Sequence, residues 1–165
     1  MNALVSRRTV MIGGAVAGTV FVAGAGVRWM GTVAPGAMVL SAVEMDVVEA
    51  VSEVLFAPGT FEVSGGDGVT SFEVDRLLAD VMGPEVAKPF RTMLGALEWG
   101  TLISRGTRFS SLPFDGRTEV LDVWASENPT PRRMAFESLQ AVLAMAFFRR
   151  PEVLARTGWR AGCMP

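Results

Sequence analysis

Residues 41–55 read SAVEMDVVEAVSEVL, and this stretch starts and repeats as an amphipathic helix does. Ser41 and Glu44 form a capping box, in which each side chain accepts a hydrogen bond from the backbone N–H of the other residue. Apolar residues then recur every three or four positions, which places them on one face of a helix. They are Val43, Val47, Val51, Val54 and Leu55, followed by the stop signal Ala57-Pro58-Gly59. The sequence therefore predicts a helix that starts at Ser41 and packs through one apolar face.

A second, short helix is predicted after a loop over residues 57–69. The loop contains Gly65-Gly66-Asp67-Gly68, which lacks the Lys-Ser/Thr of a phosphate-binding loop and is typical of a flexible surface turn. Thr70-Ser71-Phe72-Glu73 has the form of another capping box, and Gly83-Pro84 ends the apolar series that follows. That series consists of Val74, Leu77, Leu78, Val81 and Met82.

The rest of the chain continues the helical pattern. The longest apolar series ends near Ile103, and Pro89 either kinks its first turn or marks its start. A fourth helix ends near Ser126, a fifth begins at Thr130-Pro131, and a last one covers residues 151–156. Because no segment alternates cleanly between apolar and polar residues, we expect an all-α domain. It would be a small bundle of five or six helices after an N-terminal signal or anchor helix, with the third, longest helix at its centre.

The amino-terminal region has the pattern of an export signal. Arg7 and Arg8 are followed by 19 residues, Thr9 to Val27, that carry no charge. The stretch Ser6-Arg7-Arg8-Thr9-Val10-Met11 resembles the twin-arginine motif, whose mild, glycine-rich apolar runs it also shares. We therefore expect the twin-arginine translocase as a partner and the periplasm as the location. The alternative is an ordinary secretory signal or a membrane anchor that contains two arginines.

Cleavage of this signal has two candidate positions. Ala23-Gly24-Ala25 has the small-x-small pattern of a cleavage site, whereas Ala34 is followed by Pro35, which peptidases disfavour. A site between residues 25 and 37 is therefore expected. If the chain is not cut, residues 9–27 span about 28 Å as a helix, close to the ~30 Å of a bilayer core, and form an anchor. Residues 1–36 are thus a signal or uncleaved anchor plus linker, and residues 37–165 are the helical domain.

The inventory of reactive groups argues against an enzyme. The chain has no histidine, no tyrosine, a single lysine (Lys88) and a single cysteine (Cys163), so it offers no Ser-His or Cys-His pair, no His-ligated metal and no internal disulfide. Its 17 acids and 15 bases leave no excess positive charge for nucleic acid. We expect no catalytic residue, cofactor or metal in this chain. Cys163 either pairs with a partner's thiol or stays free.

A partner should therefore hold the cofactor, because twin-arginine export carries folded proteins and commonly serves cofactor-containing ones. Half of the residues are apolar, and a domain of about 125 residues cannot hide them all. We expect the partner interface to include Phe109, Phe114, Phe148 and Trp159. The alternative is that these aromatics close the core, as Phe147, Phe148 and Trp159 would do as a cluster. Arg132-Arg133 and Arg149-Arg150, at the two ends of one predicted helix, are either docking elements or solvated helix ends.

Several segments together resemble a known family. They are Leu40-Ser41-Ala42-Val43-Glu44, Val54-Leu55-Phe56-Ala57-Pro58, Arg108-Phe109-Ser110-Ser111-Leu112, Arg117-Thr118-Glu119-Val120-Leu121-Asp122-Val123-Trp124, Phe147-Phe148-Arg149-Arg150-Pro151 and Thr157-Gly158-Trp159. Over residues 40–162 the chain resembles the small subunits of the gluconate 2-dehydrogenase subunit 3 type.

The resemblance implies a non-catalytic accessory subunit, associated with the membrane. Its partner would be a large flavin-dependent dehydrogenase of the glucose-methanol-choline type, acting on alcohols or sugars, with FAD held in that partner. Electrons would pass on to a separate cytochrome or quinone. The resemblance carries no catalytic residue over to this chain.

Two other classes of function remain open at this point. A stand-alone periplasmic ligand-binding module would have a small pocket among Phe90, Trp99 and Trp124. A metal-independent hydrolase would use carboxylates such as Glu98 and Asp122, and it requires that two acids converge in one cleft.

Overall fold

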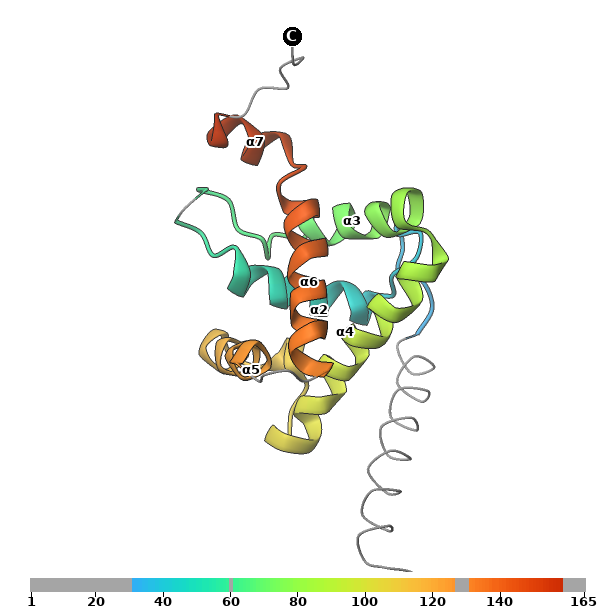
Figure 1. The fold of residues 1–165 in the computed structure, drawn as a ribbon, viewed down its shortest axis with the longest axis vertical. Helices are drawn as coiled ribbons and strands as arrows, with labels where there is room; N and C mark the ends of the chain where they lie inside the picture. Colours follow the sequence, from blue (N-terminus) through green and yellow to red (C-terminus); the bar gives the residue numbers. More distant parts are fainter. Residues whose placement is uncertain (1–30, 60, 127–130, 159–165) are drawn as a thin grey trace, which may run out of the picture.

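The chain folds into an all-α bundle, as the sequence predicts. A computed structural model describes residues 31–59, 61–126 and 131–158. Six α-helices lie within these ranges (Figure 1): α2 (Ala42–Leu55), α3 (Val69–Arg76), α4 (Pro84–Arg105), α5 (Phe114–Ser126), α6 (Pro131–Phe147) and α7 (Pro151–Thr157). A π-helical turn, η1 (Leu77–Met82), follows α3, and a 3₁₀ turn, η2 (Phe109–Ser111), precedes α5. The predicted export signal, Thr130, Trp159 and Cys163 lie outside the described residues.

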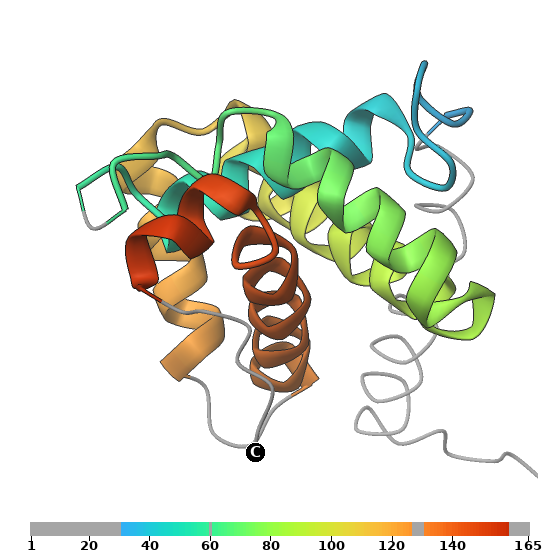
Figure 2. The same ribbon diagram turned by 90° about the horizontal axis from the view of Figure 1, so that it is seen from above.

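Helix α2 lies in the interior of the bundle. It packs against α3, α4, α5, α6 and η2, and Figure 2 shows α3 and α4 running alongside it, with α6 on their other side. Its residues Val47, Val48 and Val51 are fully buried, as are Leu94 of α4 and Leu143 of α6. Helix α4, the longest helix and the one expected at the centre, packs against α2, α6, η1 and η2. None of the helices in the described ranges is both long and apolar enough to cross a membrane.

The capping box that begins α2 is confirmed. The Ser41 N–H donates to Glu44 Oε2 at 2.7 Å, and the Glu44 N–H donates to Ser41 Oγ at 3.4 Å. Glu44 is fully buried and also accepts from Arg91 Nε of α4 at 2.6 Å. The cap therefore ties the start of α2 to α4 as well as satisfying the first turn.

The second capping box was predicted wrongly. Helix α3 begins at Val69, one residue before Thr70, and its N-cap is Gly68 in the left-handed conformation with φ 81°. Asp67 Oδ1 accepts from the Val69 N–H at 3.2 Å, so an aspartate turn satisfies the first free amide. The Thr70 hydroxyl accepts instead from Arg150 Nη1 at 3.1 Å. The hydroxyl of Thr70, which the sequence pattern assigned to the helix cap, is therefore used in a tertiary contact with Arg150.

The π turn displaces part of the predicted apolar stripe. The Gly83 N–H donates to the Leu78 carbonyl at 3.0 Å, a bond that spans five residues rather than four. Leu77 and Leu78 are buried, but Val81 is 64% exposed because the wider turn shifts the register of the residues after it. Helix α4 then starts at Pro84 and continues through Pro89, whose exposed position keeps it away from the core.

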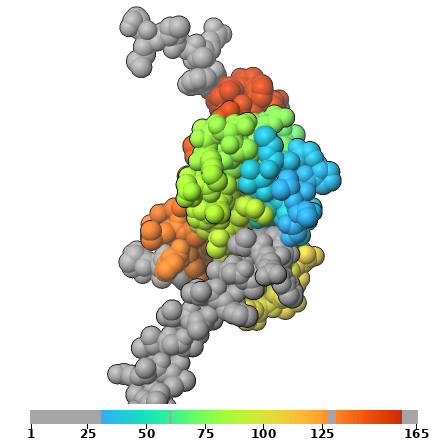
Figure 3. All heavy atoms as spheres, turned by 90° about the vertical axis from the view of Figure 1, so that its right-hand side faces the viewer, coloured from blue at the N-terminus to red at the C-terminus, as the bar shows by residue number. Residues whose placement is uncertain are grey.

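The segment before α2 is folded back onto the domain. In Figure 3 it is the blue part of the surface, beside the green of the α3, η1 and α4 region. The Asp75 side chain of α3, only 1% exposed, accepts from three consecutive backbone amides: Met38 at 2.6 Å, Val39 at 2.9 Å and Leu40 at 2.7 Å. A carboxylate held by several N–H donors forms strong, charge-assisted hydrogen bonds, so α3 fixes this segment firmly.

Candidate docking surface at the carboxyl-terminal corner

The chain turns sharply between α6 and α7, and this corner carries the candidate site. The last turn of α6 closes with the Phe148 N–H donating to Ala144 O at 2.9 Å and the Arg150 N–H donating to Phe147 O at 3.2 Å. Pro151 then starts α7, because its fixed φ and missing N–H suit the first position of a helix. Phe148 and Arg150, two positions apart, end up with opposite environments, one exposed and one buried.

Arg150 is the buried anchor of the corner. Its side chain is 3% exposed and donates to Asp67 Oδ1 at 2.9 Å, Asp67 Oδ2 at 2.6 Å, Glu152 Oε1 at 2.8 Å, Thr70 Oγ1 at 3.1 Å and the Ser64 carbonyl at 3.2 Å. Its guanidinium also lies over the Phe147 ring, 5.6 Å from the centroid. Every direction of the guanidinium fork is therefore used to hold α3, the loop before it and α7 in place.

The charges of this cluster support one another. Burial would lower the pKa of Arg150, but hydrogen bonds to Asp67 and Glu152 raise that pKa above its ordinary value. The pKa of Glu152 is lowered, first by a hydrogen bond from its own backbone N–H and then by the hydrogen bond from Arg150. Both shifts favour the charged forms, the Arg150 guanidinium and the Glu152 carboxylate.

The glycine-rich loop that faces Arg150 is packed, and the prediction of a flexible surface turn was wrong. Gly65 is buried, and its N–H donates to the Phe56 carbonyl at 2.9 Å. A Cβ on Gly65 would lie 2.9 Å from the Ser52 carbonyl carbon, and one on Gly66 would lie 2.7 Å from Glu53 Cβ. These glycines let the loop backbone lie directly on α2, which brings Asp67 to Arg150.

Four phenylalanines pack beneath the corner. The rings of Phe56 and Phe147 are stacked almost parallel, with centroids 4.4 Å apart. Phe148 meets the Phe147 ring at 5.5 Å and the Phe61 ring at 5.4 Å, both edge to face. Phe147 is fully buried, so its prediction as a core residue is confirmed, whereas Phe148 remains 38% exposed.

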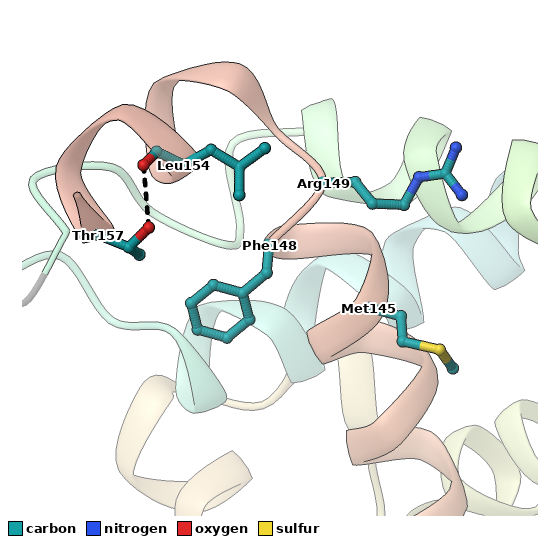
Figure 4. Close-up of a pocket in the computed structure, with 5 residues that line it drawn as sticks. All are labelled: Met145, Phe148, Arg149, Leu154 and Thr157. Carbon is teal, nitrogen blue, oxygen red and sulfur yellow. Dashed lines mark hydrogen bonds between the residues drawn. The ribbon is translucent and has the colours of Figure 1, made fainter. Parts of the chain in front are cut away.

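The exposed side of Phe148 lines a hollow of about 660 Å³. Figure 4 shows its walls: Met145 and Arg149 lie on one side, and Leu154 and Thr157 of α7 lie on the other. The Thr157 hydroxyl donates to the Leu154 carbonyl at 2.9 Å, which leaves the apolar parts of both side chains on this wall. The hollow can take apolar side chains, and Arg149 adds an exposed positive charge at its edge.

The other predicted interface residues do not join this surface. Phe109 is fully buried in η2 between α2 and α4, so its prediction as an interface residue was wrong. Phe114 is 43% exposed, but it begins α5, which Figure 1 places at the other end of α6 from α7. Trp159 lies outside the described residues. Of the four candidates, Phe148 is the one that the structure describes in the hollow.

The residues of the two alternative functions also have structural positions. Glu98 is fully buried, and its carboxylate accepts from the Ser110 N–H at 2.9 Å and the Ser110 hydroxyl at 2.7 Å. Asp122 is exposed on α5, so the two acids do not share a cleft. Phe90 belongs to the buried core, and the hollow described above is lined by none of Phe90, Trp99 and Trp124.

Neither a metal-binding cluster nor a known relative helps to assign a function to this surface. In the three described ranges no group of three Cys, Asp or Glu side chains is arranged to hold a metal ion. No family model, curated protein or solved structure matches the chain. What the protein does must therefore follow from its own sequence motifs and from the geometry of the corner.

Proposed function

We propose that this protein is a non-catalytic accessory subunit of a large flavin-dependent dehydrogenase that oxidises alcohols or sugars. It binds the folded flavoprotein, which contains the FAD, and carries it across the membrane by the twin-arginine route. Ser6, Arg7 and Arg8 supply the address, and the family resemblance of residues 40–162 supplies the class of partner. In the periplasm the complex stays associated with the membrane and passes its electrons to a separate cytochrome or quinone.

The observation that carries this proposal is the exposed aromatic hollow at the α6–α7 corner. Phe148, Met145 and Leu154 line one continuous hollow instead of being scattered singly over the surface. Grouped apolar residues mark interaction sites, and Phe and Met are enriched in the cores of interfaces. The same corner is held by the fully hydrogen-bonded Arg150, so the surface is already in shape before a partner arrives.

The binding chemistry follows from this arrangement. Apolar side chains of the flavoprotein would fill the hollow and remove Phe148 and Met145 from water. Arg149, at its edge, suits an acidic side chain of the partner, because a guanidinium pairs with carboxylates through two parallel bonds. For the flavoprotein to be carried across the membrane, the complex must stay bound for longer than translocation takes. A permanent interface that buries on the order of 2,000 Å² is stable enough for this.

Co-purification of the two chains tests the proposal. The full-length protein is co-expressed with the flavoprotein encoded beside it, and the flavoprotein recovered with it from the periplasm is measured. We expect Phe148→Ser to reduce recovery by about tenfold or more, as loss of a central interface aromatic does. Phe114→Ser is the matched control, because it removes an equally exposed phenylalanine at the other end of α6.

A second variant covers the case in which Phe148→Ser disturbs the aromatic cluster. Met145→Asp places a charge on an exposed wall of the hollow and leaves all four phenylalanines of the cluster in the sequence. Unchanged recovery with both variants would contradict the docking surface. A chain that binds an apolar small molecule but no flavoprotein would instead support the stand-alone binding module.

A further inference from the structure

Helix α6 carries a second stripe of apolar and small residues, on the side that faces away from the core. The residues of α6 that the core buries are Leu139, Val142, Leu143, Ala146 and Phe147. The outer stripe consists of Met134, Ser138, Ala141, Met145 and Phe148, all of them exposed. They follow one another at intervals of four, three, four and three residues, the heptad spacing of helices that pack side by side. The bundle therefore leaves uncovered a face with the pattern of a helix–helix contact.

The middle of the outer stripe is small and needs no water. The Ser138 hydroxyl donates to the Met134 carbonyl at 2.8 Å, so its hydrogen bond is made within the helix and survives burial. Ser138 and Ala141 would let a second helix approach closely, while the larger Met134 and Phe148 would pack at the two ends. The stripe spans about 21 Å, or four turns, at ~1.5 Å per residue. Figure 1 shows the length of α6 in front of α2 and α4.

The carboxyl end of the outer stripe carries an available positive charge. Arg149 follows the last residue of the stripe, and Figure 4 shows its side chain on the same side of the helix as Met145. In the described part of the chain, no acidic side chain pairs with Arg149. At the other end of the stripe, Arg133 pairs with Glu137 at 2.9 Å. The carboxyl end is therefore the one suited to a partner's carboxylate.

These charges argue against a second copy of α6 on the outer stripe. In an antiparallel pair centred on Ala141, Arg149 of one copy would lie opposite Arg133 of the other, because both are eight residues from the centre (149 − 141 = 8 and 141 − 133 = 8). A parallel pair would place the two Arg149 side chains together. Like charges that face each other oppose association in both arrangements. A different helix, with an acid near Arg149, fits better.

We propose that the outer stripe binds one amphipathic α-helix of the flavoprotein, antiparallel to α6, with an Asp or Glu of its first turn beside Arg149. This inference rests on the proposed function. The stripe continues the hollow, because Met145 and Phe148 belong to both. The antiparallel direction brings the positive amino end of the partner helix to the negative carboxyl end of α6. An acid in that first turn stabilises its own helix and pairs with Arg149.

Site-specific cross-linking tests the shape and direction of the bound segment. A photoreactive benzophenone amino acid replaces Met134 or Met145, one at a time, in the full-length chain co-expressed with the flavoprotein. We expect both positions to cross-link to a single flavoprotein helix, with the Met145 contact about eleven residues nearer its amino end than the Met134 contact. Cross-links to a loop or a strand, in the opposite order, or to a second copy of this chain would overturn the inference.

A bulky residue in the middle of the outer stripe tests the close approach. Ala141→Trp should reduce the flavoprotein recovered with this chain by about tenfold or more, because the indole would hold the two helices apart. Gln140→Trp is the matched control: it is also exposed, but it lies outside the stripe, and recovery should not change. Thermal unfolding of both variants should match the wild type, because neither site is buried.

Failure of this inference differs from failure of the proposed function. If Phe148→Ser lowers recovery of the flavoprotein and Ala141→Trp does not, the hollow binds its partner without the rest of the outer stripe, and the inference is wrong while the proposed function stands. If neither variant lowers recovery, the docking surface of the proposed function fails as well.

Discussion

Arg150 and Asp67 lie 83 residues apart in the sequence, yet they form two parallel hydrogen bonds of 2.9 and 2.6 Å. The pair joins the start of α7 to the loop that precedes α3. The guanidinium is almost completely buried, whereas about a third of the Asp67 side chain is exposed. Replacing the arginine leaves a carboxylate that water can still reach. The loss of folding free energy should therefore be smaller than for a fully buried pair.

Arg150→Lys should therefore destabilise the domain by about 2 kcal/mol, because lysine keeps the charge but cannot form the two-pronged contact. Urea unfolding of both proteins measures the difference. Arg149→Lys, one residue earlier and exposed, should change the free energy of unfolding by less than about 0.5 kcal/mol. Equal effects of the two substitutions would show that the pair does not hold the corner.

Asp75→Asn should cost about 2–3 kcal/mol, because an amide has one acceptor where the carboxylate has two and turns an N–H₂ toward backbone donors. The measurement is again the free energy of unfolding. Asp80→Asn is the control on the adjacent turn, and its expected change is within about 0.5 kcal/mol. A small effect at Asp75 would mean that the segment before α2 contributes little to stability.

Gly65→Ala and Gly100→Ala should shift stability in opposite directions. A methyl group on Gly65 would meet the Ser52 carbonyl of α2, so we expect a loss of about 1–3 kcal/mol. Gly100 lies within α4 with open space at its Cβ, and alanine there should add about 0.5–1 kcal/mol through helix propensity. Thermal unfolding of both variants separates them, and a stabilising Gly65→Ala would contradict the packed loop.

The Glu152 carboxylate should contribute a small stability that depends on pH. Its pKa is lower in the folded chain, so the contribution is present above its ordinary pKa of about 4.5 and is lost as the pH falls through the lower, folded value. Because the side chain is 43% exposed, the effect should stay below about 1 kcal/mol. Glu152→Gln should therefore be less stable than the wild type at pH 7 and indistinguishable from it near pH 2. A difference that persists at pH 2 would assign the effect to packing.

Replacement of Arg7 and Arg8 by lysine should abolish export, because the translocase reads the planar guanidinium pair. Immunoblots of periplasmic and cytoplasmic fractions measure this, with Arg28→Lys as the control outside the motif. The flavoprotein should remain in the cytoplasm with the double variant. A flavoprotein that still reaches the periplasm would contradict the carrier role and leave the signal itself intact.

The elements that the sequence predicts well are those whose signals are local. The Ser41–Glu44 box sets the start of α2, Pro131 starts α6 and Gly158 ends α7 in the left-handed conformation. Each of these depends on residues within four positions of one another. Local hydrogen bonds and fixed backbone angles act before any tertiary contact forms, so a single sequence contains them.

The rest depends on contacts between distant residues. Thr70 binds Arg150, 80 residues away, and Asp75 binds amides 35 to 37 residues away, so neither role is visible in a local pattern. The sequence shows that Phe148 lies near the end of α6, but it does not show how much of the ring is exposed. The turn between α6 and α7 leaves one side of the ring in the hollow. Phe109 shows the reverse: it lies in a short turn between helices, and the packing of that turn buries it.

Helix α3 holds both ends of the described chain with only eight residues. Near its start Thr70 meets the Arg150 cluster, and near its end Asp75 binds the segment before α2. The two ends should therefore open together, as one cooperative unit, when α3 unfolds. In hydrogen exchange, the amides of residues 38–40 and of α7 would then share one opening free energy, and a loss of protection at one end would report unfolding at the other.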